Sequence, residues 1–193
     1  MRVISHIDDP MVCGTATQLD TFWTTLSSHV VLKRGGRIDG TTLTKYLGRV
    51  FQTVNDSGYR GFRVRMPESF FKALGEDAGL TIGISKTSVT PTVASKEADS
   101  QELSDITTPL DNAEHSAYRG IVGKLQWVKH ERPEIRYAVK CVSHALATPH
   151  VSDMKAAKRI VRYLLGCWNV WMHLVLPDIT TAELKAQTTQ LIG

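Results

Sequence analysis

The feature that most constrains the fold is an amphipathic run in the second half of the chain, which two prolines divide. Pro133 and Pro149 cut this run into segments of helical length. Proline opens a helix at its first turn and helps to end the helix before it. We therefore predict three helices, at about residues 114–129, 133–147 and 152–165.

The third of these predicted helices shows the pattern most clearly. Ser152 is expected to cap its N-terminus, since serine favours that position. One side is apolar at helical spacing and consists of Met154, Ala157, Ile160, Val161, Leu164 and Leu165. The opposite side carries a basic row, which consists of Lys155, Lys158, Arg159 and Arg162.

The first half of the chain has short, strand-like apolar runs. Two of them, at residues 3–7 and 11–13, flank Asp8-Asp9-Pro10, which predicts a tight hairpin. A second hairpin is predicted over residues 47–54 and 59–66, because the residues between these runs tolerate turn geometry.

Helices are also expected in this half. Thr15 is a suitable N-cap for a helix that runs to about His29. Pro67 fits the first turn of another helix, which continues through Leu74. Short apolar runs at residues 30–32 and 170–176 predict two further strands. Together with the three later helices, these elements predict an α+β fold.

Residues 81–112 separate the two halves. They are rich in Ser, Thr, Pro, Asp and Glu and lack a sustained period, which is typical of a loop or linker. We therefore divide the chain into four parts: residues 1–80, a linker or mobile loop at 81–113, a helical region at 114–176 and a tail at 177–193.

Charge is distributed unevenly along the chain. The formal net charge is +4, yet residues 114–166 alone hold ten Lys or Arg against four Asp or Glu. A local basic excess of this kind favours contact with a polyanion such as nucleic acid. A solvated helix face collects the same residues, so both interpretations stay open.

The sequence also bounds the class of protein. No apolar stretch approaches the roughly 20 residues that a membrane-spanning helix needs, so we expect no membrane partner. The three cysteines, Cys13, Cys141 and Cys167, lie far apart and lack metal-ligand spacing. This predicts a reduced intracellular protein, either cytoplasmic or nuclear.

Asp8 and Asp9 are the residues best suited to carry chemistry. Adjacent carboxylates in a hairpin can gather magnesium, which prefers oxygen ligands and is commonly held together with substrate phosphates. Two such ions would activate an attacking hydroxyl and stabilise a leaving pyrophosphate. Aspartate is also a common turn residue, so the pair by itself leaves a purely structural role open.

The residues around this pair resemble the copia-type retrotransposon reverse transcriptase. His6-Ile7-Asp8-Asp9 is similar to the family's Tyr-x-Asp-Asp motif, and Met11-Val12-Cys13-Gly14 is similar to the strand that follows it. Further blocks follow in the family's order and cover most of residues 3–176: Thr44-Lys45-Tyr46-Leu47-Gly48, Thr108-Pro109-Leu110, Tyr118-Arg119-Gly120-Ile121-Val122-Gly123-Lys124-Leu125, Arg132-Pro133-Glu134-Ile135-Arg136-Tyr137-Ala138-Val139 and Lys155-Ala156-Ala157-Lys158-Arg159-Ile160-Val161-Arg162-Tyr163-Leu164-Leu165-Gly166.

The resemblance implies a part of an RNA-directed DNA polymerase. Asp8 and Asp9 would be catalytic, magnesium-binding carboxylates in a partial palm at residues 1–80. Residues 114–176 would form a three-helix region, similar to a thumb or connection, that grips an RNA–DNA or DNA template-primer duplex. The rest of the retroelement polyprotein is the expected protein partner. The expected phosphate contacts are Lys155, Lys158, Arg159, Arg162, Lys124, Lys129 and Arg132.

This sequence also departs from the family's pattern. The family's third metal-binding carboxylate lies on an earlier strand than any in this chain, and His6 stands where the family has tyrosine. Pro10 lacks a backbone donor and is expected to disturb the hairpin. We therefore predict a polymerase fragment that is inactive alone. The alternatives are a non-catalytic nucleic-acid-binding module and a decayed retroelement product.

Overall fold

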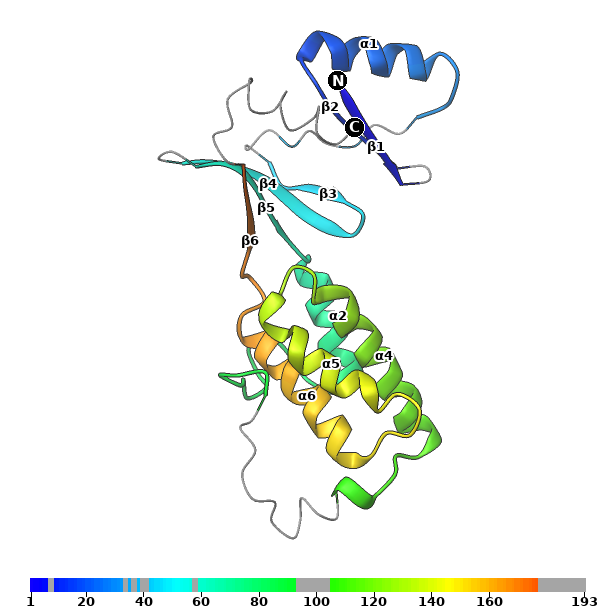
Figure 1. Cartoon of the computed structure of the whole chain (residues 1–193), viewed down its shortest axis with the longest axis vertical. Coiled ribbons are helices and arrows are strands. Elements are labelled where there is room, and N and C mark those ends of the chain that lie inside the picture. The colour runs from blue at the N-terminus through cyan, green and yellow to red at the C-terminus, as the bar shows by residue number, and fades with distance from the viewer. Residues whose placement is uncertain are drawn as a thin grey trace, which may run out of the picture.

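The computed structural model describes residues 1–6, 9–32, 35, 38, 42–56, 59–92 and 105–176. Two antiparallel sheets and a group of packed helices make up this part of the chain, which confirms the predicted α+β class. Figure 1 shows the helices at one end, a four-stranded sheet in the middle and a two-stranded hairpin with one helix at the other end.

The two-stranded sheet is the first predicted hairpin. Strands β1 (Arg2–His6) and β2 (Asp9–Cys13) pair in antiparallel register, with His6 opposite Asp9. Helix α1 (Ala16–Ser27) follows, and Thr15 caps it as predicted, in a capping box with Gln18. Residues 30–32 form no strand, so that prediction was wrong: three apolar residues extend the chain without a neighbouring strand to pair with.

The four-stranded sheet has the order β3-β4-β5-β6, and all neighbouring strands are antiparallel. It consists of β3 (Thr44–Tyr46), β4 (Arg49–Asp56), β5 (Tyr59–Arg65) and β6 (Met172–Leu176). Two residues join β3 to β4, and both have positive φ, at 46° for Leu47 and 73° for Gly48. Positive φ at both central positions gives the turn a twist that suits two antiparallel strands.

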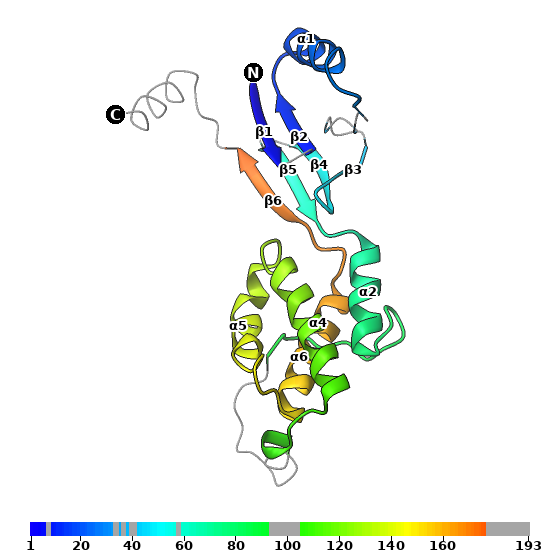
Figure 2. The ribbon, with the colours of Figure 1, turned by 90° about the vertical axis from the view of Figure 1, so that its right-hand side faces the viewer.

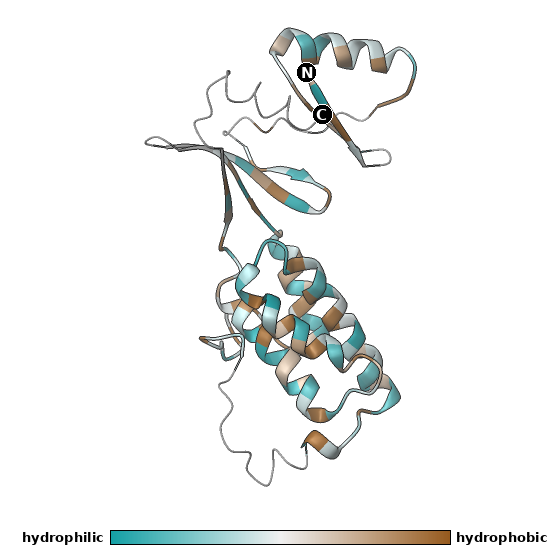
Figure 3. Ribbon diagram, viewed as in Figure 1, coloured by the Kyte–Doolittle hydropathy of each residue, from teal (hydrophilic) through white to brown (hydrophobic). Residues whose placement is uncertain are grey.

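The helices form the hydrophobic core. They are α2 (Glu68–Ala78), α4 (Asn112–Val128), the short 3₁₀ helix η1 (Pro133–Ile135), α5 (Arg136–His144) and α6 (Val151–Gly166). Apolar and polar residues are interspersed along these helices (Figure 3), as in amphipathic helices. The fully buried side chains of the core all come from this group and include Phe71, Leu74, Tyr118, Ile121, Leu125, Ile160 and Leu164.

The helix ends refine the sequence predictions. Pro67 is the N-cap of α2 rather than a residue of its first turn, and Gly79 ends that helix in the left-handed conformation. His150, not Ser152, caps α6, because the carboxylate of Asp153 accepts a hydrogen bond from the backbone of His150 at 2.8 Å. Ser152 therefore lies inside the helix.

Packing joins segments from both ends of the chain. Helix α2 lies against α4 and α6, and strand β6, which follows α6, pairs with β5. Figure 2 shows β6 beside β5 and α2 beside the later helices. The helical core combines α2 with the later helices. The predicted division of the chain at residues 80 and 113 stays a prediction.

Candidate nucleic-acid interface

Of the two adjacent carboxylates, Asp9 lies within the described residues, at the start of a strand. Asp9 is exposed at the first position of β2, and its carbonyl oxygen accepts a hydrogen bond of 2.8 Å from the hydroxyl of Tyr46 in β3. This contact joins the hairpin to the four-stranded sheet. Asp8 lies outside the described residues.

Pro10 was expected to disturb the hairpin, but the pairing of β1 with β2 continues through it. It lies within β2, directly opposite Ser5 of β1. Within the described part of the chain, β2 pairs with β1 alone. A strand with a free edge tolerates proline, because the missing donor need not interrupt a second ladder.

The donors needed for a magnesium site are not assembled around Asp9 by the described residues. No three His, Cys, Asp or Glu side chains come together there in a group that could hold a metal. The fit of magnesium therefore depends on Asp8 and on carboxylates beyond the described ranges. Carboxylate oxygen remains the right donor chemistry for that ion.

Two of the predicted phosphate contacts on α6 have partners inside the protein. Lys155 is 58% exposed, but its ammonium forms an ion pair with Asp105. Arg159 donates to the hydroxyl of Thr90 at 3.1 Å. Both partners lie in sequence between α2 and α4, so this connection covers part of the basic side of α6.

The described parts of the same connection contact both ends of α6. A Cβ on Gly166, at the C-terminus of α6, would lie 3.0 Å from the side chain of Thr87. Near the N-terminus of α6, the amide of Val151 donates to the carbonyl of Thr108 at 3.0 Å. The described parts of the connection therefore run antiparallel to the helix.

The other two basic residues of α6 are left open. Lys158 and Arg162 are half-buried, and neither forms a side-chain hydrogen bond or ion pair with any residue in the described ranges. They lie four residues apart and thus on one side of the helix. Among the predicted contacts on α6, this pair is the most available to an external phosphate.

The two predicted contacts on α4 and at its C-cap also have partners inside the protein. Lys124 in α4 forms an ion pair of 2.8 Å with Asp77 of α2 and donates to the carbonyl of Ala73 at 3.2 Å. Lys129 donates to the side chain of Gln126. Their ammonium groups are therefore partly occupied by neighbours.

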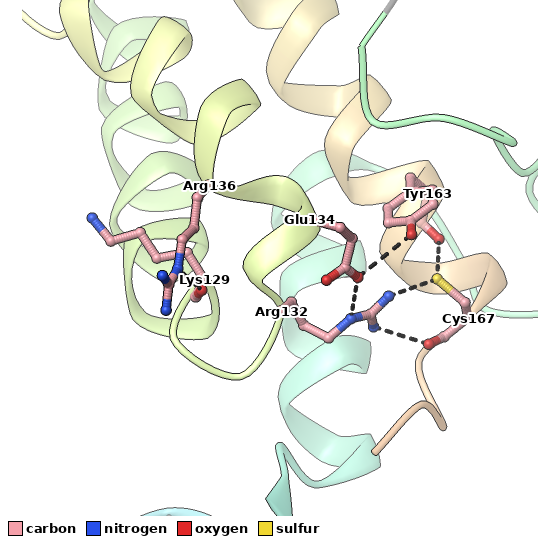
Figure 4. A network of polar contacts seen from close by, with 6 residues as sticks. All are labelled: Lys129, Arg132, Glu134, Arg136, Tyr163 and Cys167. Carbon is pink, nitrogen blue, oxygen red and sulfur yellow. Dashed lines mark hydrogen bonds and ion pairs between the residues drawn. The ribbon is translucent and has the colours of Figure 1, made fainter. Parts of the chain in front are cut away.

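Arg132 is buried, with a side chain only 4% exposed. Figure 4 shows its guanidinium between Glu134 of η1 and Cys167 at the end of α6. It donates to Glu134 at 2.6 Å, to the Cys167 carbonyl at 3.0 Å and to the Cys167 sulfur at 2.9 Å. Burial alone would lower the pKa of Arg132, but the hydrogen bonds with Cys167 and Glu134 raise it overall. We therefore assign Arg132 to the link between η1 and α6.

Sequence reasoning missed the role of Cys167. Its sulfur accepts from Arg132 and lies 3.1 Å from the carbonyl of Tyr163, which completes the network of Figure 4. Thirty-five positions separate Cys167 from Arg132. No local pattern in the sequence indicates that the two residues meet.

Within the described ranges, no helix is both long enough and apolar enough to cross a bilayer.

Comparisons with known proteins relate the chain to retroelements. It is 48% identical over 52 residues to the "Retrovirus-related Pol polyprotein from transposon RE1" of Arabidopsis thaliana, a match that covers 27% of this chain and 4% of that protein. The RE2 polyprotein of the same plant is 45% identical over 49 residues, with 25% and 3% covered. The "Putative transposon Ty5-1 protein YCL074W" of Saccharomyces cerevisiae is 26% identical over 161 residues, which cover 82% of this chain and 47% of that protein.

The matches are local relative to the lengths of these relatives. The chain spans only a few per cent of the two plant polyproteins and less than half of the yeast protein. No family model and no solved structure matches the chain. Two of these relatives are named retrovirus-related Pol polyproteins and the third a putative transposon protein, so the chain is similar to retroelement proteins.

Proposed function

We propose that the chain is a palm and thumb-like part of a copia-type reverse transcriptase, an RNA-directed DNA polymerase. The observation that carries the proposal is the β1–β2 hairpin, with Asp9 at its turn, which Tyr46 joins to the sheet that continues into α2. The similarity to retrotransposon Pol polyproteins supports the same origin.

In this proposal the acidic pair acts only within a larger assembly. Asp8 and Asp9 would hold magnesium, which when bound lowers the barrier to nucleotidyl transfer by stabilising charge on the attacking and leaving oxygens. The described residues bring no metal-binding group of three side chains together. We expect no polymerisation by the isolated chain, because rate enhancement requires the metals and the primer to be held in fixed positions relative to each other.

A chimaera tests the catalytic part of the proposal. Residues 1–176 would replace the matching region of an active copia-type Pol protein, and primer extension on an RNA template would be measured. We expect template-dependent extension that Asp9→Ala abolishes and that Asp20→Ala, a change of another exposed carboxylate on α1, leaves unchanged. A folded chimaera that binds template-primer but extends nothing, or that ignores Asp9→Ala, would contradict the proposal.

The isolated chain provides the complementary measurement. Incubated with RNA template, DNA primer and magnesium, it should give no extension. Template-dependent incorporation that is lost in Asp8→Ala would instead show that the isolated chain is a complete polymerase.

A second candidate function is non-catalytic nucleic-acid binding. It is favoured by Lys158 and Arg162, which have no hydrogen-bond or ion-pair partner in the described part of the chain. We expect the wild type to bind an RNA–DNA duplex with an affinity that falls as salt rises. The double variant Lys158→Gln/Arg162→Gln should reduce the slope of this salt dependence by about two, one for each phosphate contact.

The matched control removes two charges elsewhere. Arg119 on α4 and Lys140 on α5 are both exposed, so Arg119→Gln/Lys140→Gln changes net charge equally. Equal losses in the two double variants would show binding through net charge and would contradict a site on α6.

A further inference from the structure

Arginine and tryptophan side chains gather on one face of the four-stranded sheet, away from α6. Arg63 and Arg65 lie two positions apart on β5, and because side chains alternate along a strand they share a face. Trp168 and Trp171 come from the link between α6 and β6. All four side chains are partly exposed, so a ligand from solution can reach the cluster.

Indole rings hold both guanidinium groups. The Cζ atom of Arg65 lies 5.1 Å from the ring centre of Trp168 and 4.7 Å from that of Trp171. The Cζ atom of Arg63 lies 4.6 Å from the Trp171 ring. Contacts of this kind attract the cation and fix the plane of the guanidinium. A ring face accepts the charge but not the in-plane hydrogen bonds, so the N–H groups at the edges of each guanidinium need acceptors elsewhere.

The two arginines differ in how many of their N–H groups have a hydrogen-bond acceptor among the described residues. The Nε and Nη1 atoms of Arg65 are buried and have no hydrogen-bond partner in the described part of the chain. Among the same residues, Arg63 donates to one neutral acceptor, the side-chain oxygen of Gln52, at 2.9 and 2.5 Å. Within the described residues, neither arginine has a carboxylate within ion-pair distance. A buried donor without a partner is costly, so a movement of the Arg65 side chain that brings these donors to an external oxyanion would offset that cost.

The neighbouring positions on this face add positive charge. The register places Gln52 and His173 on either side of Arg63, and Val50 beside Arg65. Lys45 of β3 is paired with Val50 and is exposed. Three basic side chains thus lie on one face of the sheet, on strands β3 and β5.

We propose that this face binds the phosphate backbone of a nucleic-acid strand through Arg63 and Arg65. A guanidinium with a fixed plane is suited to two phosphate oxygens at once. The partly exposed indole rings beside it can also stack against bases. The inference deepens the proposed function, on which it rests for the identity of the polyanion, and it adds a contact surface separate from α6.

The test compares matched variants of the full chain. Binding of a fluorescein-labelled RNA–DNA duplex would be measured over a range of salt for the wild type, Arg63→Gln/Arg65→Gln and Arg63→Lys/Arg65→Lys. Arg119→Gln/Lys140→Gln serves as the charge control, and Lys158→Gln/Arg162→Gln reports on α6. Thermal unfolding of each variant, followed by circular dichroism, identifies any that fail to fold.

We expect the glutamine variant to weaken binding more than the charge control does and to lower the salt slope by about two. The lysine variant should bind less tightly than the wild type, because an ammonium lacks the paired donors. Excess inorganic phosphate should not displace the duplex, since one ion cannot replace several contacts.

Other outcomes would overturn the inference. If both glutamine and lysine variants bind as the wild type does while the α6 variant loses affinity, the proposed function stands and this site does not. If the lysine variant binds the duplex as tightly as the wild type, positive charge alone is sufficient. That result would contradict a site that depends on the paired donors of arginine. If the wild type fails to bind the duplex even at low salt, both the site and the nucleic-acid function are wrong.

Discussion

At the scale of single residues, two helical glycines differ in what surrounds them. Gly75 is buried in α2, and a Cβ there would lie 2.6 Å from the carbonyl oxygen of Leu80. That backbone is held in place, because the Leu80 amide donates to the Gly75 carbonyl at 2.7 Å. Gly120 in α4 is exposed and has no atom within 4 Å of the same position. Only the first position requires glycine for steric reasons.

The two glycines therefore predict opposite effects of the same substitution. Gly75→Ala should lower the free energy of unfolding by about 1–3 kcal/mol, since the chain must shift to admit the methyl group. Gly120→Ala should raise it by about 0.5–1 kcal/mol, because alanine favours a helix interior. Urea denaturation of both variants provides the measurement. Similar effects at the two positions would contradict the steric explanation.

Tyr118 is the residue whose ionisation should affect stability. It is fully buried and donates to the carbonyl of Val142 at 2.5 Å. Burial, and secondarily the charge on Asp153, raises the pKa of Tyr118 well above its ordinary value. The folded state therefore keeps a proton that the unfolded state loses near pH 10. Stability from this group is fully present below about pH 10 and falls as pH rises further.

The prediction is a decline in unfolding free energy between pH 8 and pH 11. Urea denaturation at both pH values would measure it. Tyr118→Phe should be less stable than the wild type at pH 8, by about 1 kcal/mol for the lost hydrogen bond, and should decline less on going to pH 11. An equal decline in both proteins would assign the alkaline sensitivity to other groups.

At the scale of elements, Arg132 links the 3₁₀ helix η1 to the end of α6. It reaches Cys167 from a chain position 35 residues away and binds Glu134 beside it. Replacing Arg132 by alanine leaves the Cys167 carbonyl without this donor. We expect Arg132→Ala to lower the free energy of unfolding by about 1.5–3 kcal/mol, the range for hydrogen bonds to charged groups.

A neighbouring arginine supplies the control for this link. Arg136 also appears in Figure 4, but it is exposed and donates to the Lys129 carbonyl at 3.3 Å. Its replacement by alanine should change stability by no more than about 0.5 kcal/mol, as surface substitutions usually do. Chemical denaturation compares the two variants. A cost for Arg132→Ala as small as that for Arg136→Ala would show that the link does not stabilise the helices.

The elements also show which features a single sequence can predict. The helices of the core were predictable because their apolar residues recur at helical spacing, as in α6 with Ile160, Leu164 and Leu165. The hairpin β4–β5 was predictable from its turn residues. The strand predicted at residues 30–32 was wrong, because strand formation depends on a pairing partner that the β-propensity of the residues does not reveal.

The candidate interface was less accessible to sequence reasoning. Spacing placed Lys155 and Arg162 on one side of α6, but pairing of Lys155 with Asp105 bridges 50 positions. The burial of Arg132 depends on Cys167, which is equally remote in sequence. Helical periodicity predicts which side of a helix a residue occupies. Which of those residues a distant loop covers depends on tertiary packing alone.

At the scale of the whole molecule, the described residues form one part with a buried core and another part with little buried surface. The buried core draws on residues between Met66 and Leu165. Helix α1, in contrast, has no buried residue, and together with Met1 and His29 it lines an open surface pocket of about 500 Å³. Low burial of apolar surface implies a low free energy of local opening, because that burial dominates stability. The first hairpin and α1 should therefore open independently of the helical core.

Hydrogen exchange measured by mass spectrometry tests this difference in one experiment. Peptides that cover β1, β2 and α1 should exchange quickly, whereas peptides from α4 and α6 should be protected up to the free energy of global unfolding. The prediction bears on function, because β2 carries Asp9: a hairpin that opens easily cannot hold its carboxylate in a fixed place. If the proposed function is right, binding of the rest of a Pol polyprotein should then slow exchange in the hairpin and leave α4 unchanged. Equal protection in the hairpin and in α4 without any partner would contradict the division and would show that the chain holds this carboxylate firmly by itself.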